Sequence, residues 1–195
     1  MIISHLGRLT VLFCCLRGVN AMNITVLWTA GYSCLLEFNG STVPCSLGKN
    51  GVTEYKREGD GCTPTGTFIL RRGFYRSDKV SLELSKFSRS FFTETRPEFG
   101  WCDDPLSELY NQFLNSVPIT ASYENLWLES SPVYDLLGVI GYNDDPPVPY
   151  LGSAIFFHVT ETYGPTAGCV AIAMKDLQWI LQNIKEDTRM IIRQA

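Results

Sequence analysis

Two side chains in the last quarter of the chain have the types and spacing of a thiol–imidazole pair. Cys169 directly follows Gly168, and His158 lies eleven residues earlier, with Gly164 and Pro165 between them. A cysteine nucleophile needs a thiolate, a base or cation that favours it, and donors for the developing oxyanion. Gly168 lets a substrate carbonyl approach the backbone and leaves amide N–H groups free to point at it. Two adjacent strands joined by the Gly-Pro turn would bring both side chains within hydrogen-bond reach.

The pair alone does not establish catalysis. His158 is the only histidine after residue 21, so imidazole chemistry in the domain depends on it. A lone histidine at a strand end is usually a satisfied structural residue, however, and a cysteine in an apolar segment is usually buried and inert. On these two residues by themselves, a structural role is the more frequent outcome.

The elements that must position the pair are mostly strands. Glycine and proline are frequent, with 16 and 10 residues, and strand-forming residues are plentiful, which favours a fold with many tight turns. We predict that 153–158 is a strand with His158 at or near its end, that 168–172 is a short strand, and that an amphipathic helix begins at Met174. Further strands are expected at 24–28, 33–38, 41–47, 67–71 and 189–193 and, as a continuous buried run, at 134–142. The fold class is therefore mainly β with a few helices, in one domain.

Three other segments are harder to interpret. The glycine-rich stretch 56–66 lacks the Gly-Lys-Ser/Thr ending of a phosphate loop and precedes a strand, so we interpret it as a structural turn at the rim of a cleft. Residues 85–100 show no clear period and are expected to be a long loop. Asp104 before Pro105 predicts a helix start, followed by apolar residues on one face that would be core: Leu106, Leu109, Tyr110, Phe113 and Leu114.

Composition sets wider limits. Apolar residues make up 45% and charged residues 18% of the 195-residue chain, which is typical of a globular protein. The net charge of −4 and the lack of a basic stripe argue against nucleic acid as a partner. No segment has the roughly 18 apolar residues of a membrane-spanning helix. The sequence does not predict the oligomeric state.

The N-terminal segment and the cysteines leave alternatives open. Residues 1–21 contain Arg8, a short apolar run and Ala21, as a signal peptide would; alternatively, Met22 is the natural start and the first 21 residues are upstream translation. The domain is then residues 22–195. Its five cysteines are an odd number, so at least one thiol is free, and which of Cys34, Cys45, Cys62 and Cys102 pair is not readable from sequence. The chain has no C-x-x-C and few histidines, so we predict no metal and no cofactor.

The residues around the pair resemble a known signature. The segments Gly152–Val159 and Pro165–Ala171 resemble the YkuD-type L,D-transpeptidase catalytic domain, in which a histidine precedes a Ser/Thr-x-Gly-Cys element. Three other segments, 59–68, 101–111 and 139–143, resemble one branch of that family, and all occur in the expected order between about residues 24 and 193.

The resemblance implies a β-sandwich-like catalytic domain that acts on peptidoglycan stem peptides in the periplasm or cell envelope. Cys169 would attack the amide after the third residue of the stem, usually a diamino acid, and an amine from another stem would resolve the thioester. His158 would be the base, while Thr166 and Gly168 would shape the turn and the oxyanion site. Residues that could line the cleft and hold the peptide are Ala167, Tyr142, Asn143, Trp101, Asp103, Asp104, Tyr110 and Asn111, with helix capping as the favoured role of Asp104 and core packing as the alternative for Trp101 and Tyr110.

Departures from the family pattern keep other functions open. Many members have glycine where this chain has Val159 and histidine where it has Ala167, which affects acceptor preference. The alternative function is a carboxypeptidase or endopeptidase that uses the same nucleophile with water as acceptor. A third function is a non-catalytic wall-binding module, against which the intact Cys169 and His158 argue.

Overall fold

The fold is built from fourteen strands and two helices in the described part of the chain. A computed structural model describes residues 22–83, 86–118 and 120–195; the predicted leader, 1–21, lies outside them. The helices are α1 (Lys86–Phe91) and α2 (Met174–Asn183). The strands are β1 (Ile24–Trp28), β2 (Ser33–Phe38), β3 (Ser41–Ser46), β4 (Val52–Thr53), β5 (Thr63–Pro64), β6 (Gly66–Tyr75), β7 (Phe92–Glu94), β8 (Gly100–Cys102), β9 (Phe113–Leu114), β10 (Tyr123–Asn125), β11 (Leu136–Ile140), β12 (Phe156–Val159), β13 (Val170–Ile172) and β14 (Arg189–Gln194).

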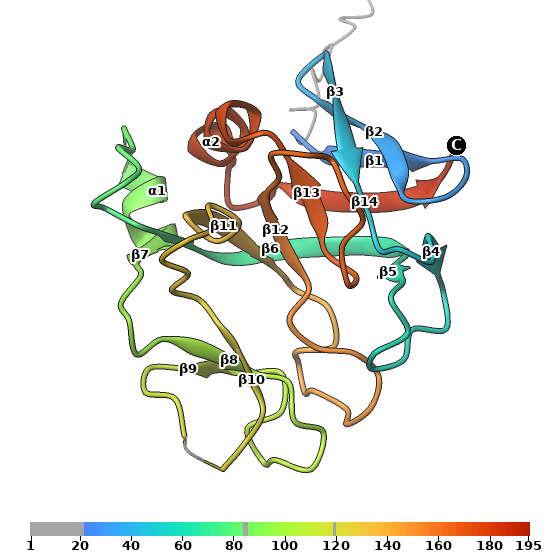
Figure 1. The fold of residues 1–195 in the computed structure, drawn as a ribbon. Helices are drawn as coiled ribbons and strands as arrows, with labels where there is room; N and C mark the ends of the chain where they lie inside the picture. Colours follow the sequence, from blue (N-terminus) through green and yellow to red (C-terminus); the bar gives the residue numbers. More distant parts are fainter. Residues whose placement is uncertain (1–21, 84–85, 119) are drawn as a thin grey trace, which may run out of the picture.

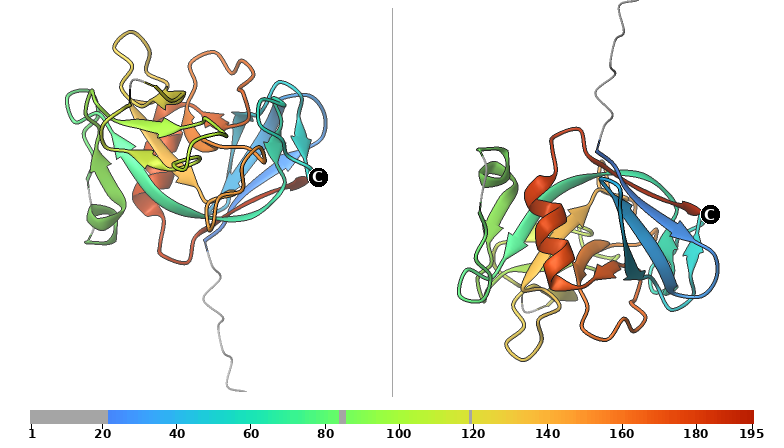
Figure 2. Two further views of the ribbon diagram at one scale, coloured as in Figure 1. Left: turned by 90° about the horizontal axis from the view of Figure 1, so that it is seen from below. Right: turned by 90° about the horizontal axis from the view of Figure 1, so that it is seen from above.

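The main sheet curls until its strands form a ring (Figures 1 and 2). Its nine strands have the order β11-β12-β13-β3-β2-β1-β14-β6-β7, and β6 also pairs with β11, so every strand except β7 belongs to the ring. A three-stranded sheet, β10-β8-β9, lies below the main sheet in Figure 1. The predicted mainly β class with a few helices is confirmed, and the sandwich-like character comes from one sheet folded over on itself.

Strand β11 is the centre of the fold because both of its faces are covered. All five of its residues are buried. Leu136 and Ile140 face the main core, and Leu137 and Val139 face a second apolar cluster that includes Phe99 and Trp101. This explains the continuous apolar run at 134–142, since a strand buried on both faces loses the usual alternation.

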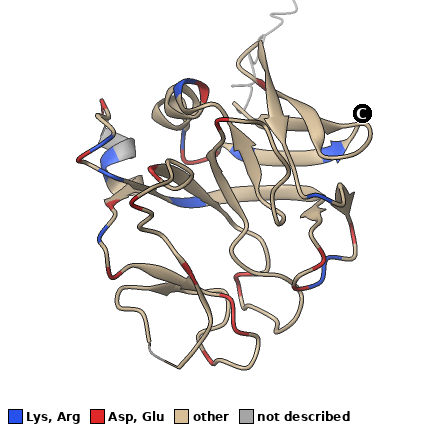
Figure 3. Ribbon diagram, in the orientation of Figure 1, with Lys and Arg blue, Asp and Glu red and all other residues tan. Residues whose placement is uncertain are grey.

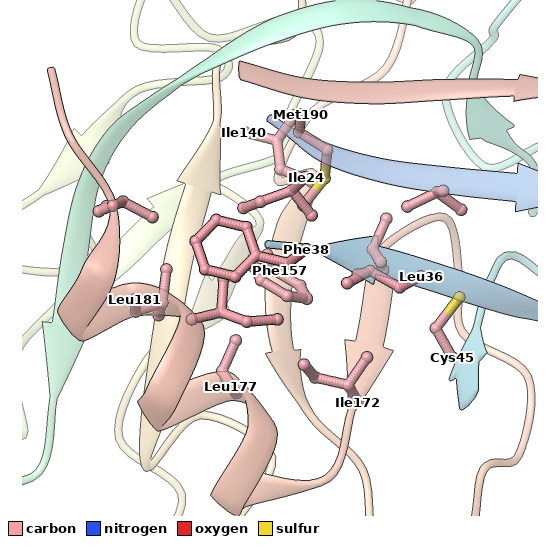
Figure 4. Packing of buried hydrophobic residues seen from close by; sticks show 14 of the residues in the cluster. Ile24, Leu36, Phe38, Cys45, Ile140, Phe157, Ile172, Leu177, Leu181 and Met190 are labelled. Carbon is pink, nitrogen blue, oxygen red and sulfur yellow. The ribbon is translucent and has the colours of Figure 1, made fainter. Parts of the chain in front are cut away.

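Helix α2 packs on the main-core side of this strand. It buries Leu177, Ile180 and Leu181 among residues of the main core, several of which are shown in Figure 4. Each such side chain contributes about 1.5–3 kcal/mol relative to an exposed one. Gly138 lets the helix approach β11, because a Cβ there would lie 3.3 Å from Leu181 Cδ2.

The helix predicted to start at Asp104 is wrong. Residues 105–111 are turns, and Leu106 and Leu109 are 82% and 47% exposed. Asp104 Oδ1 accepts the Leu106 N–H at 2.9 Å, as in an Asx turn. The chain then reverses so that β9 pairs with β8. The apolar residues at helical spacing therefore do not share one buried face. Tyr110 and Leu114 are buried, whereas Leu106 and Leu109 are exposed to solvent.

The expected long loop at 85–100 is also wrong. It contains α1, β7 and the start of β8, and β7 pairs in parallel with β6. Phe91 and Phe92 are buried against the main core. Tertiary packing of these rings overrides a local sequence that has no clear period.

Cys34 and Cys45, directly opposite each other on β2 and β3, form a disulfide. Cys62, Cys102 and Cys169 are free, and the latter two are buried. None of the helices in the described residues is long and apolar enough to cross a membrane.

Candidate active site

Strand register places Cys169 and His158 on one face of the main sheet. His158 pairs with Ala171 across the parallel strands β12 and β13. Side chains alternate along a strand, so Cys169, two residues before Ala171, is on the same side as His158. The intervening residues Val170 and Ile172 face the main core instead. The predicted pairing of the two strands is therefore present, with His158 inside β12 and Cys169 immediately before β13. The described residues show no hydrogen bond between the two side chains, since the sulfur bonds Ala154 and Phe156 and the ring bonds Val159 O.

The Cys169 sulfur lies between two backbone groups. The thiol donates to Ala154 O at 3.3 Å, and Phe156 N–H donates to Sγ at 3.3 Å. The residue is 7% exposed. Burial is the largest influence on the thiol and raises its pKa to about 12. The Cys169 side chain is therefore a neutral thiol at physiological pH.

His158 is held as a neutral imidazole. Its ring is 6% exposed, and the edge-on ring of Tyr134 lies 5.5 Å away between centroids. Burial lowers its pKa to about 4. Nδ1 lies 2.8 Å from Val159 O, and a carbonyl only accepts, so Nδ1 carries the proton and Nε2 keeps its lone pair. The backbone oxygen of Val159 therefore orients the ring.

The turn before Cys169 is fixed by Thr166. Its hydroxyl donates to Cys169 O at 2.8 Å and accepts the Gly168 N–H at 3.1 Å. The Gly168 amide is therefore occupied and does not point freely at a substrate, contrary to our expectation. The Cys169 N–H has no hydrogen-bond partner among the described residues.

Two depressions meet at Cys169. One contains His158, Pro165 and Thr166, and the other contains Lys56, Glu58 and Ser153. Four residues line both depressions: Glu124, Tyr134, Ala167 and Cys169. The second depression is bounded by the glycine-rich stretch, which confirms our interpretation of residues 56–66 as the rim of a cleft.

Carboxylates dominate the charge beside the sulfur, and acidic segments mark the loops below the main sheet (Figure 3). Glu124 lies opposite Trp101 in the β10–β8 pair, which puts it on the same side as Asp103. Burial raises the pKa of Glu124, and the charge of Asp103 adds to this. Asp103 Oδ1 is buried and has no hydrogen-bond partner within the described ranges. Lys56, the nearby cation, is paired with Asp60 at 2.6 Å.

Five residues that we expected to line the cleft lie behind it instead. Trp101, Tyr110 and Asn111 are 6%, 2% and 4% exposed. Tyr142 donates its hydroxyl to Leu151 O at 2.7 Å, and Asn143 closes its own loop through Val148 and Gly152. None of the five lines either depression, whereas Thr166, Ala167 and Gly168 line the depressions beside Cys169.

Sequence reasoning missed Glu58, Glu124 and Tyr134. Tyr134 donates its hydroxyl to Glu124 at 2.8 Å and touches both His158 and Phe156. No local pattern marks these residues, because distant segments bring them to Cys169. Among the described residues, no group of three or more His, Cys, Asp or Glu has the arrangement of a metal site.

Comparison with known proteins identifies a family. Residues 35–192 match the family model YkuD, described as the L,D-transpeptidase catalytic domain. No curated protein matches the chain.

Solved structures provide distant likenesses. L,D-transpeptidase 3 from Mycobacterium tuberculosis has 10% identity and a TM-score of 0.43, covering 89% of this chain and 62% of that one. An L,D-transpeptidase from Mycobacterium smegmatis has 10% identity and a TM-score of 0.39, covering 88% and 59%. The Ldtfm–avibactam carbamoyl enzyme has 11% identity and a TM-score of 0.41, covering 91% and 50%. The chain thus spans only half to two thirds of the length of these proteins, which are too distant for a residue-by-residue comparison of the sites.

Proposed function

The chain belongs to the YkuD family of L,D-transpeptidase catalytic domains, and from that premise we propose that it transfers acyl groups between peptidoglycan stem peptides through a thioester on Cys169. The observation that carries this proposal is the register of β12 and β13, which puts the thiol and a neutral imidazole on one face at the junction of two depressions.

The first half-reaction forms the thioester. Sγ attacks the carbonyl carbon of the amide after the third stem residue, and its proton moves to His158 Nε2. Because the thiol and the imidazole are both neutral at rest, this transfer accompanies the attack. The Cys169 N–H, which has no partner in the described part of the chain, supplies a donor for the oxyanion. The imidazolium then protonates the leaving amine, and the C–N bond breaks to release the terminal D-amino acid.

The second half-reaction transfers the acyl group. The amine of another stem attacks the thioester carbonyl, His158 removes a proton from that amine, and the C–S bond breaks to return the thiol. The depressions on either side of Cys169 leave room for the two peptides. The carboxylates of Asp103 and Glu124 suit the ammonium group of a diamino acid.

We place this reaction outside the cytoplasm, in the periplasm or cell envelope. The Cys34–Cys45 disulfide supports this assignment, because stable disulfides are characteristic of oxidising compartments.

The test is incubation of the purified chain with a disaccharide tetrapeptide, followed by intact-protein and product mass spectrometry. We expect a transient adduct on Cys169 and cross-linked dimers or exchanged terminal D-amino acids. Tripeptide alone would identify a carboxypeptidase with water as acceptor. Absence of any adduct with a stem peptide or a carbapenem would instead indicate a wall-binding module.

Two variants assign the roles. Cys169→Ala should abolish the adduct and turnover while the circular dichroism spectrum stays unchanged. His158→Ala should slow acylation by roughly 10²–10⁴-fold, as expected for loss of a general base. Full activity in Cys169→Ala would refute the mechanism.

A further inference from the structure

The segment that brackets the Cys169 sulfur contains an unusual backbone conformation. Ala154 has a φ of 50°, in the left-handed region that residues with a side chain rarely occupy. Its carbonyl accepts the thiol proton at 3.3 Å, and two residues later the Phe156 N–H donates to the same sulfur at 3.3 Å. Phe156 is held by pairing with Val139, whereas Ala154 precedes the strand. The carbonyl that holds the thiol therefore depends on a residue outside regular structure.

One buried side chain holds Ala154 in this conformation. Asn111 Oδ1 accepts the Ala154 N–H at 3.0 Å and the Trp101 Nε1–H at 2.9 Å. A conformation with positive φ persists at a non-glycine residue only when its surroundings fix it. Tyr110 and Glu58 hold the neighbouring Gly152 and Ser153, but among the described residues only Asn111 binds the amide of Ala154.

The orientation of the Asn111 amide is itself fixed. Nδ2 donates to Tyr142 O at 3.0 Å and to Asn143 O at 2.7 Å. The side chain thus uses two donors and two acceptor positions, its full capacity. Turning it over would set Nδ2 against two N–H donors and Oδ1 against two carbonyls, leaving buried groups unpaired. The Asn111 side-chain amide is therefore held in one orientation next to Ala154.

We propose that Asn111 is a positioning residue for the nucleophile: by anchoring Ala154, it directs the carbonyl that holds the Cys169 thiol neutral and in one orientation until substrate arrives. Asn111 does not touch the sulfur. The catalytic consequence rests on the proposed function of Cys169, whereas the effect on the thiol does not.

The proposal predicts opposite effects on two reactions. Without the anchor, Ala154 relaxes to negative φ and its carbonyl leaves the thiol, while the strand-held Phe156 N–H still stabilises the thiolate. Alkylation of Cys169 by iodoacetamide at neutral pH should become roughly fivefold faster, the change expected for losing one net hydrogen bond to the protonated form. Its pH midpoint should fall by about 0.7. Acylation by a stem peptide should become roughly tenfold slower in kcat, because the sulfur is no longer held in one orientation.

The experiment follows the alkylation of each cysteine by peptide-resolved mass spectrometry between pH 7 and about 13, a range that includes the Cys169 pKa of about 12. Asn111→Gly removes the acceptor without straining a backbone whose φ is 55° at that position. Trp101→Phe is the matched control, because it removes the other donor to the same oxygen and leaves the Ala154 bond intact. The pH midpoint of Cys169 alkylation should not change in this variant. Cys102 is 0% exposed and adjoins Asn111 through the Asn111 N–H to Cys102 O bond, so its alkylation reports local opening.

A lower Cys169 midpoint in Asn111→Gly, with Cys102 still protected, supports the proposal. An unchanged midpoint in folded Asn111→Gly overturns it, as does an equal shift in Trp101→Phe or parallel exposure of Cys102. If Asn111→Gly does not fold, Ala154→Val gives the same test, because a β-branched residue disfavours positive φ while Asn111 stays intact. Since alkylation needs no peptidoglycan substrate, absence of acyl transfer in the wild type would refute the proposed function and leave this test valid.

Discussion

Replacing Gly168 by alanine tests whether the turn before Cys169 requires glycine. Gly168 has a φ of 154°, and a Cβ there would lie 2.9 Å from Cys62 O and 3.3 Å from Ile155 Cδ1. The first neighbour is backbone, so it cannot rotate away. Thr166 binds both sides of this residue, which limits how the turn can adjust. The added methyl must therefore displace either the 56–62 loop or Cys169.

The structure permits an estimate of the cost. The unfavourable φ contributes about 1–2 kcal/mol, and overpacking contributes about 1–3 kcal/mol. Alanine also restricts the unfolded chain more than glycine does, which stabilises the folded state by about 0.4–1 kcal/mol. We expect Gly168→Ala to lower the free energy of unfolding by about 2–4 kcal/mol and to slow acylation of Cys169.

Substitutions at two other glycines separate the contribution of the unfavourable φ from that of overpacking. Gly40 has a φ of 77° and nothing within 4 Å of the position that a Cβ would take, so Gly40→Ala isolates the backbone effect; we expect a loss of about 1 kcal/mol. Gly164 has no positive φ and only Thr162 Oγ1 at 3.4 Å, so Gly164→Ala should be neutral or slightly stabilising. Urea unfolding of all three variants, followed by acylation assays, provides the measurement. A Gly168→Ala protein as stable as Gly40→Ala would refute the predicted overlap with Cys62.

Two further predictions concern stability. Removing the Cys34–Cys45 disulfide, which closes a segment of sequence separation 11, in a Cys34→Ala/Cys45→Ala variant should cost about 3 kcal/mol; an unchanged urea midpoint would show that the pair contributes nothing. The folded-state pKa of His158, about 4, lies below the unfolded value of about 6.5, so the unfolded chain binds the extra proton between them. The free energy of unfolding should therefore fall by up to about 3 kcal/mol as the pH drops through this window. His158→Gln should make the free energy of unfolding less dependent on pH there, and an equal pH dependence in both proteins would contradict the assignment to His158.

The sequence predicts elements whose signals are local. The stretch 136–140 is apolar because β11 is buried on both faces, and α2 follows from Leu177, Ile180 and Leu181 on one side of a helix. Cys169 and His158 could be selected because the residues around them resemble a family signature. These features depend on neighbouring residues in the chain, and the structure has them where they were expected.

The failures come from contacts between distant segments. Leu106 and Leu109 look like a helix face, yet the chain reverses in a tight turn and leaves them in solvent. Asn111 looks like a substrate contact, but the four hydrogen bonds of its side chain go to Trp101, Ala154 and the 142–143 backbone. Glu124 reaches Cys169 from β10 of the three-stranded sheet, and Tyr134 reaches it from the turn before β11. Such roles are decided by tertiary packing and leave no periodic signal.

The pairing of β1 with β14 has a consequence for biosynthesis. The two strands run in parallel from Ile24 opposite Met190 to Trp28 opposite Gln194, and β14 also pairs with β6. A nascent chain therefore leaves the ribosome with a gap in its sheet until residues 189–194 emerge. Cys169 is translated before the ring around it can close. Closure of the ring therefore has to wait until residues 189–194 have been translated, and a premature stop codon within β14 would yield a protein that contains His158 and Cys169 but lacks the closed ring.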